Sequence, residues 1–260
     1  MTTETLLRLG SFLAILAVMG AAETLWPRRT PTTGRLRRWT ANLSVAFLST
    51  VLTRLLVPFI PAVVAAWCAE HGVGLFNFFA LSPVPGWIAS VLALDLTIYG
   101  QHVLFHHHQI LWRVHRMHHI DLDIDASTGI RFHPIEIVLS MLIKLAVVVL
   151  LGPPAGAVIL FEIMLNGCAV FNHANVRIPL HVDRWLRLIL VTPDQHRVHH
   201  STDMREANMN FGFNFPWWDR LFGTYKAQPE LGHDGMRIGL NIFRDPKYGG
   251  LARMLALPFL

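Results

Sequence analysis

The chain has 260 residues, of which 53% are hydrophobic and only 15% are charged, and its mean hydropathy is +0.42. Soluble domains usually carry about a quarter charged residues, so this composition excludes an ordinary soluble domain and predicts a membrane protein. The net charge of +5 would suit nucleic acid. However, the basic residues flank apolar runs and no nucleic-acid-binding motif is present, so we expect no nucleic-acid partner.

The N-terminal third predicts two membrane spans joined by a basic loop. The first apolar run, at about residues 9–26, starts after charged residues and ends without a clear cleavage site, so we expect a retained span and not a signal peptide. Five arginines follow at residues 28–38. The second run, at about residues 43–68, contains two prolines and is predicted to be one kinked span or a span with a broken end.

The middle of the chain predicts three more spans around a polar segment. An apolar run from Trp87 to about Leu104 leads directly into histidine-rich residues 105–134. Another apolar run covers residues 135–171, and Gly-Pro-Pro interrupts it at 152–154, which predicts two antiparallel spans with a tight hairpin.

The remainder is mostly polar. Within it, residues 185–192 are expected to form a short amphipathic helix at the membrane surface. The two isolated cysteines exclude a disulfide framework and a thiolate metal site.

Eight histidines form three tight clusters with i+3 and i+4 spacings, which place several imidazoles on one face of a helix. These histidines are His102, His106, His115, His118, His119, His196, His199 and His200. The pattern H-x-x-H-H occurs twice, which predicts a polynuclear metal site, because imidazole is a common ligand of iron, zinc and copper. His173 is a candidate ninth ligand or a hydrogen-bonding histidine, and His133 is a further candidate.

The predicted topology brings these clusters together. If the arginine-rich loop 28–38 lies in the cytoplasm, as the positive-inside rule suggests, every histidine cluster falls on that same face.

Four other polar residues are candidates for the site. Asp95 lies within an apolar run two helical turns before His102 and is expected to orient a ligand imidazole. Tyr99, one turn before His102, is either catalytic or an interfacial aromatic residue. Asn172 and Asp194 are possible additional ligands or supports of ligands, and Asp194 is alternatively a helix cap.

Other chemistries lack their motifs. The chain contains no H-E-x-x-H, G-x-S-x-G, Walker or dinucleotide-binding sequence, so it gives no support for a zinc protease, a serine hydrolase or built-in nucleotide binding.

Longer motifs surround the histidines. The first half contains DLTIYGQHVLFH, LWRVHRMHH and RFHPIE, and the second half contains FNHANVR, TPDQHRVHHS and NFGFNFPWWDRLFGTY. Over residues 90–226 the chain resembles the sterol desaturase and fatty acid hydroxylase superfamily of integral-membrane di-iron oxygenases.

The resemblance implies an all-α membrane bundle of about four to five spans, capped by a cytosolic helical domain that holds a histidine-lined di-metal site. Residues 1–85 would be N-terminal spans, 86–226 the catalytic domain and 227–260 a tail. The eight clustered histidines and His173 would bind two iron ions. Some relatives have another histidine where this chain has Arg177, so the ligand set is smaller here or His133 compensates.

The implied activity is hydroxylation or desaturation of an unactivated C–H bond in a lipid, such as a sterol, a fatty acyl chain or a carotenoid. O2 would be the cosubstrate, and the lipid would enter from the bilayer. No segment of the chain carries electrons, so an external reductase, ferredoxin or cytochrome is implied. The alternatives are a histidine-rich metal transporter or sensor, and a haem-binding electron carrier.

Overall fold

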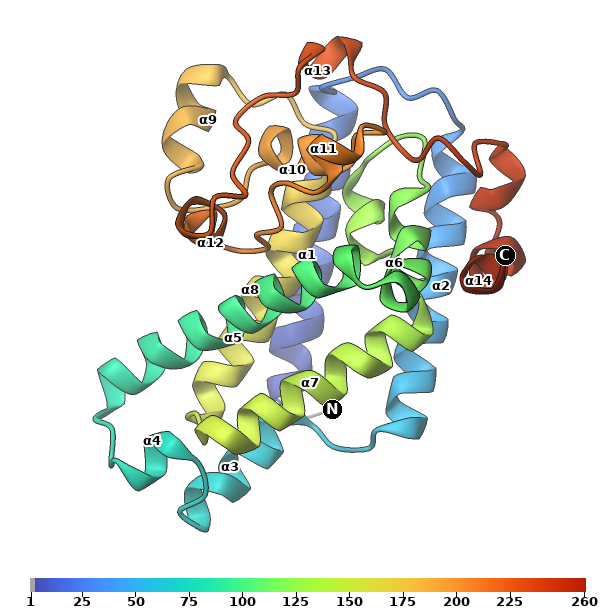
Figure 1. Ribbon diagram of the computed structural model, residues 1–260. Helices are drawn as coiled ribbons and strands as arrows, with labels where there is room; N and C mark the ends of the chain where they lie inside the picture. Colours follow the sequence, from blue (N-terminus) through green and yellow to red (C-terminus); the bar gives the residue numbers. More distant parts are fainter. Residues whose placement is uncertain (1–2) are drawn as a thin grey trace.

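A computed structural model describes residues 3–260, which form helices joined by turns and loops and contain no β-strand (Figure 1). The longer helices are α1 (Thr3–Leu25), α2 (Arg35–Leu56), α3 (Pro61–Glu70), α5 (Pro83–His107), α6 (Gln109–His119), α7 (Pro134–Leu151) and α8 (Ala155–His173). The shorter ones are α4 (Leu75–Phe78), η1 (Ala126–Ile130), α9 (Leu180–Leu186), α10 (Pro193–His199), α11 (Met204–Ala207), α12 (Trp217–Leu221), α13 (Gly232–Gly235), η2 (Pro246–Gly249), α14 (Leu251–Ala256) and η3 (Leu257–Phe259). The predicted all-α class is confirmed.

Within the described residues, five segments are long and apolar enough to cross a membrane. They are Glu4–Leu25, Arg35–Phe78, Pro83–His107, Pro134–Leu151 and Ala155–His173. Large apolar side chains on their outer faces are exposed, including Phe47 and Leu55 on α2, as expected of helices in contact with lipid. The fold is that of a multi-pass membrane protein.

The second apolar run is broken and not merely kinked. Helix α2 ends at Leu56, and α3 begins at Pro61 after an extended stretch. Pro58 and Pro61 lack the amide hydrogen that a continuing helix needs, so the break follows from their positions.

The predicted turn between α7 and α8 is confirmed. Gly152 ends α7 with a φ of 62°, in the left-handed region that glycine adopts without strain. The two helices then splay apart, since α3 and α5 each pack against both of them (Figure 1). This divergence leaves space inside the bundle.

The prediction of a short amphipathic helix at residues 185–192 is wrong in position, because the helix in this region lies earlier in the chain. The helix α9 begins at Leu180, directly after Pro179, and ends at Leu186. Leu188 and Ile189 lie in the turns that follow, because Trp217 on α12 binds the carbonyl of Leu188 through its indole N–H at 2.7 Å. Both of these residues are exposed, as a surface position requires.

One end of the bundle gathers all the histidine-rich segments. The C-terminal ends of α5 and α8 meet α6 and α10 there, and the short helices α9 to α13 lie together over this end (Figure 1). The N-terminal spans belong to the same packed unit, because α1 packs on α8 and α2 packs on α7. The three-part division of the chain stays a prediction.

Candidate metal centre

The nine histidines predicted as ligands converge in two groups within the described part of the chain. The first group is His102, His106, His115, His119 and His199, and the second is His118, His173, His196 and His200. In each group the ligand atoms lie within 4.8 Å of one another. No histidine of either group is more than 8% exposed. Nine buried imidazoles in contact with one another are typical of a metal centre and not of a hydrophobic core.

The spacing of the H-x-x-H-H motifs divides each motif between the groups. On α6, His115 and His119 are one turn apart and both enter the first group, whereas His118 enters the second. The α10 motif does the reverse, because His196 and His200 enter the second group and His199 the first. The two motifs therefore supply both groups, and they bring the groups side by side.

Hydrogen bonds at Nδ1 fix the orientation of several rings. The Nδ1 atoms of His102, His173 and His199 lie 2.8, 2.7 and 2.8 Å from the carbonyl oxygens of Phe211, Ala169 and Met209, respectively. A carbonyl oxygen only accepts hydrogen bonds, so each Nδ1 carries the proton. The Nε2 atom of each ring then presents a lone pair to the centre, as in a metal-ligating histidine.

The contact between His118 and His173 is the arrangement expected of two ligands of one cation. Their Nε2 atoms lie 3.0 Å apart. In both rings Nδ1 donates to a carbonyl, that of Arg131 at 3.2 Å for His118 and that of Ala169 for His173. Two neutral rings with protonated Nδ1 would point lone pairs at each other, which is repulsive unless a positive ion lies between them.

Burial favours the neutral form of five histidine rings that lie outside the membrane-spanning helices. It lowers the pKa of His118, His119, His196 and His200 well below the ordinary value, and that of His199 to about 3, with neighbouring histidines adding to the effect at most of these rings. A neutral imidazole is the form that binds a metal, so the groups are ready to act as ligands at physiological pH.

Glu136 is a supporting residue that the sequence analysis did not single out. It lies in the first turn of α7, is 4% exposed, and accepts a hydrogen bond from Nδ1 of His115 at 2.7 Å. Carboxylates in this position orient a ligand histidine and raise its basicity. The signal in the sequence was an acidic residue at the start of an otherwise apolar helix.

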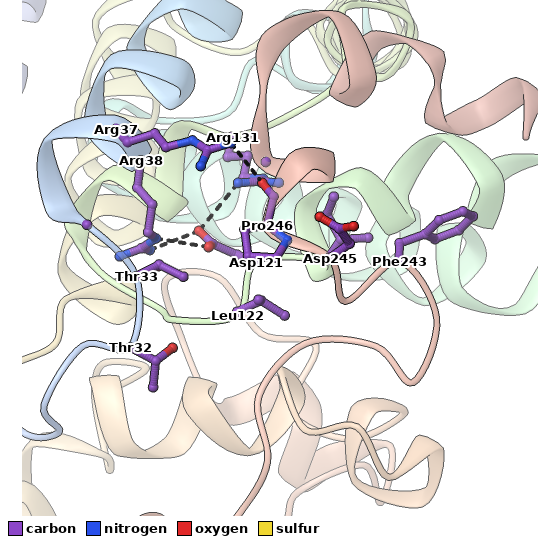
Figure 2. Close-up of a pocket in the computed structure, with 13 residues that line it drawn as sticks. Thr32, Thr33, Arg37, Arg38, Asp121, Leu122, Arg131, Phe243, Asp245 and Pro246 are labelled. Carbon is purple, nitrogen blue, oxygen red and sulfur yellow. Dashed lines mark hydrogen bonds and ion pairs between the residues drawn. The ribbon is translucent and has the colours of Figure 1, made fainter.

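A buried ion-pair network fixes the position of Arg131, whose carbonyl binds His118 of the second histidine group. Figure 2 shows Arg38 and Arg131 converging on Asp121, beside a surface pocket of about 260 Å³. Burial opposes ionisation of Asp121, but the two guanidinium groups hold its pKa at about 2. Because the carbonyl of Arg131 also binds His118, the network fixes a residue that orients a ligand.

A second support comes from the C-terminal half. The carboxylate of Asp219 accepts hydrogen bonds from the backbone amides of Phe211 and Gly212 at 2.8 and 2.9 Å, and it also binds Thr224. It thereby fixes the segment whose carbonyl orients His102. The neighbouring Arg220 guanidinium lies over the ring of Tyr225.

Asp95 does not bind a ligand imidazole, and the catalytic role of Tyr99 stays a prediction. Asp95 accepts a hydrogen bond from the indole of Trp218 at 2.8 Å, and the Tyr99 hydroxyl lies 2.9 Å from that of Thr224. Both residues attach α5 to the segment that covers the centre. The expectation for Asp95 failed because the backbone carbonyl of Phe211 already orients His102.

The three remaining candidates have other partners. His133 caps α7 through Nδ1 and reaches the carbonyl of Leu255 through Nε2, so neither nitrogen is left for a metal and His133 does not compensate for the Arg177 position. Asp194 forms buried ion pairs with Arg197 and Arg28, while Thr192 caps α10.

Asn172 donates to the carbonyl of Phe213 at 3.1 Å, and its oxygen has no partner in the described residues. It therefore supports the covering segment and does not belong to either histidine group.

A cavity of about 580 Å³ leads from the first group into the membrane-spanning part of the bundle. His102 and His115 form its inner end, and Leu43 and Phe47 of α2 line it near the lipid-facing surface. Most of the other lining side chains are apolar, among them Phe12, Ile98, Phe105, Phe132, Met141 and Phe213. This shape and lining suit an alkyl chain that must reach the centre.

Comparisons with known proteins agree with this geometry. The model of the family described as fatty acid hydroxylase matches residues 87–224. The chain is 28% identical to ornithine lipid hydroxylase OlsE of Rhizobium tropici over 66% of this chain and 50% of that protein. It is 30% identical to human alkylglycerol monooxygenase over 62% of this chain and 35% of that protein. A Delta(7)-sterol 5(6)-desaturase, erg3C of Aspergillus fumigatus, is 24% identical over 72% and 65%.

The chain thus spans half or less of the length of the first two of these relatives. No solved structure gives a significant match.

Proposed function

Because the chain belongs to the fatty acid hydroxylase family, we propose that it is a membrane-bound di-iron oxygenase that hydroxylates or desaturates a lipid. The observation that carries this proposal is the convergence of nine buried histidines in two adjoining groups at the inner end of an apolar cavity. The named relatives act on different lipids, so the comparisons alone do not select the substrate.

The donor set fits two iron ions. The close approach of the His118 and His173 Nε2 atoms supports a bound cation at this site. The first group offers five imidazoles, whereas a structural zinc ion takes four ligands in a tetrahedron. Five nitrogen ligands suit a metal that accepts higher coordination, and imidazole is a good ligand of iron.

When bound, the two irons would supply the redox chemistry that activates O2 against an alkyl C–H bond, for which acid–base groups have no handle. For hydroxylation the balance is one lipid C–H, one O2, two electrons and two protons, giving the alcohol and water. We assign the supply of electrons to a separate electron-transfer protein, since no residue group described here carries them.

The protein's own residues position the substrate and exclude water. The cavity walls are apolar, and Phe105, Phe132 and Phe213 line it close to His102 and His115. Glu136 fixes the ring of His115, and the carbonyl of Phe211 fixes that of His102. Such fixed orientation reduces the rearrangement that the reaction would otherwise require.

We assign the entrance to the lipid-facing side of the bundle. Helix α1 packs on α8 and α2 packs on α7, and both α1 and α2 contribute residues to the cavity wall. A lipid would therefore enter between α1 and α2 from the bilayer, with the metal centre on the cytoplasmic side beside the arginine-rich loop.

The test is product formation by purified, iron-loaded protein in nanodiscs with O2, a chemical reductant or reductase, and a panel of sterols, acyl lipids and carotenoids. We expect one lipid class to gain an oxygen atom from isotopically labelled O2, or to lose two hydrogens. A protein with iron bound that converts no lipid of the panel would contradict the proposed function.

A further inference from the structure

The inner end of the cavity contains a carboxylate oxygen that has no partner. Glu136 is 4% exposed and lines the cavity, and its Oε1 atom binds His115. Its Oε2 atom is buried and accepts no hydrogen bond from any residue described. A buried acceptor without a donor is costly, and a charged one especially so, so a site of this kind is built for a donor that arrives with a ligand.

A second polar pair is formed by Gln101 of α5 and Ser140, which lies one helical turn after Glu136 on α7. The side-chain amide of Gln101, adjacent to His102 in sequence, donates to the hydroxyl of Ser140 at 2.6 Å, and the Gln101 oxygen is buried without a partner in the described part of the chain. Both residues line the same cavity as Glu136. The polar groups of this inner end thus leave two acceptor oxygens free beside the first histidine group.

The two basic side chains that line the cavity in the described part of the chain are paired elsewhere. Lys144 and Arg8 also line the cavity, but both pair with Glu162, at 2.8 and 2.9 Å. Lys144 is eight residues after Glu136 on the same helix, a rise of about 12 Å. The two cations therefore lie toward the far end of the cavity and do not pair with the acceptor oxygens of its inner end.

The geometry points to a substrate class. We propose that Glu136 Oε2, with Gln101 beside it, binds a hydroxyl or ammonium group of the lipid substrate, so that the oxidised carbon lies close to a headgroup that donates hydrogen bonds. This proposal rests on the proposed function. A bare hydrocarbon or a carotenoid would leave the carboxylate unpaired, and an ester group has no hydrogen to donate to it.

The test measures binding, which does not require the metal or turnover. The metal-stripped protein in nanodiscs would be titrated with three probes of equal chain length: a 1-O-alkylglycerol, an alkylamine and a fatty acid methyl ester. We expect the hydroxyl and ammonium probes to bind about tenfold or more tighter than the ester, as the loss of one charged hydrogen bond implies. Equal affinities for the three probes would overturn the proposal.

Two variants test whether Glu136 and Gln101 cause the difference in affinity between the probes. Glu136→Gln keeps an oxygen for His115 and presents an N–H to the cavity, so it should remove the preference of the metal-stripped protein for the hydroxyl and ammonium probes. Gln101→Leu removes the unpartnered oxygen and the hydrogen bond to Ser140 and should reduce the preference by a smaller factor, which keeps the proposal testable if Glu136→Gln does not fold. The exposed Glu70→Gln is the matched control and should bind all probes as the unmodified chain does.

Three outcomes separate this proposal from the proposed function. Loss of metal from Glu136→Gln together with an unchanged probe preference would assign Glu136 to the support of His115 alone and contradict the substrate class. Oxidation of the ester as fast as of the alkylglycerol would contradict it as well and leave the oxygenase intact. A binding preference without any oxidation by the iron-loaded protein would support the subsite and contradict the oxygenase.

Discussion

At the level of single residues, backbone carbonyls determine which nitrogen of several imidazoles carries the proton. At His102, His118, His173 and His199 a backbone carbonyl holds the proton on Nδ1, so the Nε2 lone pair is free. The Nε2 lone pairs of His118 and His173 then face each other at a distance that is unfavourable for two neutral rings without a cation. The ligand role therefore follows from the backbone partners as much as from the histidines themselves.

Removing one histidine from each group should separate the two ions. We expect His199→Ala to deplete the first group and His118→Ala the second, so that each variant retains about one ion per chain and the double variant retains none. Metal analysis of the purified variants measures this. The exposed His108→Ala is the control, and an equal loss of metal from it would contradict the assignment.

The Asp219 carboxylate offers a second test at this scale. Asp219→Asn replaces one of the two oxygens that hold the Phe211 and Gly212 amides, so one buried N–H loses its acceptor. We expect the unfolding free energy to fall by about 1–3 kcal/mol and the metal to dissociate more easily. Thermal unfolding with and without chelator measures both effects. Asp234→Asn, at an exposed side chain, should change neither.

At the scale of the elements, the sequence predicts the ligand positions better than their supports. The i+3 and i+4 spacings place His115, His118 and His119 on one helix, and the turn at Gly152 follows from Gly-Pro-Pro. Glu136 and Phe211 support these ligands from segments distant in the chain. Such contacts depend on tertiary packing, which local spacing does not report, and the same limitation explains the wrong partner expected for Asp95.

The packing of η1 against α8 gives a test at the element scale. A Cβ atom on Gly129 would collide with the backbone carbonyl of Ala169, one turn before His173. We expect Gly129→Ala to lower the unfolding free energy by about 1–3 kcal/mol, because neither backbone can yield freely. Gly100→Ala on α5 has open space around the new methyl group and should be neutral or slightly stabilising. Equal destabilisation of the two variants in thermal unfolding would contradict this packing.

The whole molecule places its polar chemistry at one end of an apolar bundle. The segments that carry the nine histidines reach that end from α5, α6, α8 and α10, while α3 and α4 lie toward the opposite end (Figure 1). The resemblance of the motifs predicted this arrangement, and the number and direction of the spans explain it physically, since every histidine-bearing segment begins or ends on one side.

Sidedness is therefore testable in intact cells. In a chain whose two cysteines are replaced, we expect Arg205→Cys and His108→Cys to react with a membrane-impermeant thiol reagent only after the cytoplasmic face is opened. Glu70→Cys, at the end of α3, should react from outside. All three positions are exposed, so reactivity reports the side of the membrane and not burial. Reaction of Arg205→Cys and Glu70→Cys from the same side would contradict the topology.

The metal content of the purified chain is the most direct test of whether the two histidine groups bind two iron ions. After expression with iron and reloading with ferrous iron where zinc has entered, the account predicts about two irons per chain, one for each histidine group. The irons should be lost together on chelation, with a lower thermal stability, because a metal that binds only the folded chain stabilises it. No bound metal above background in folded protein would contradict the account.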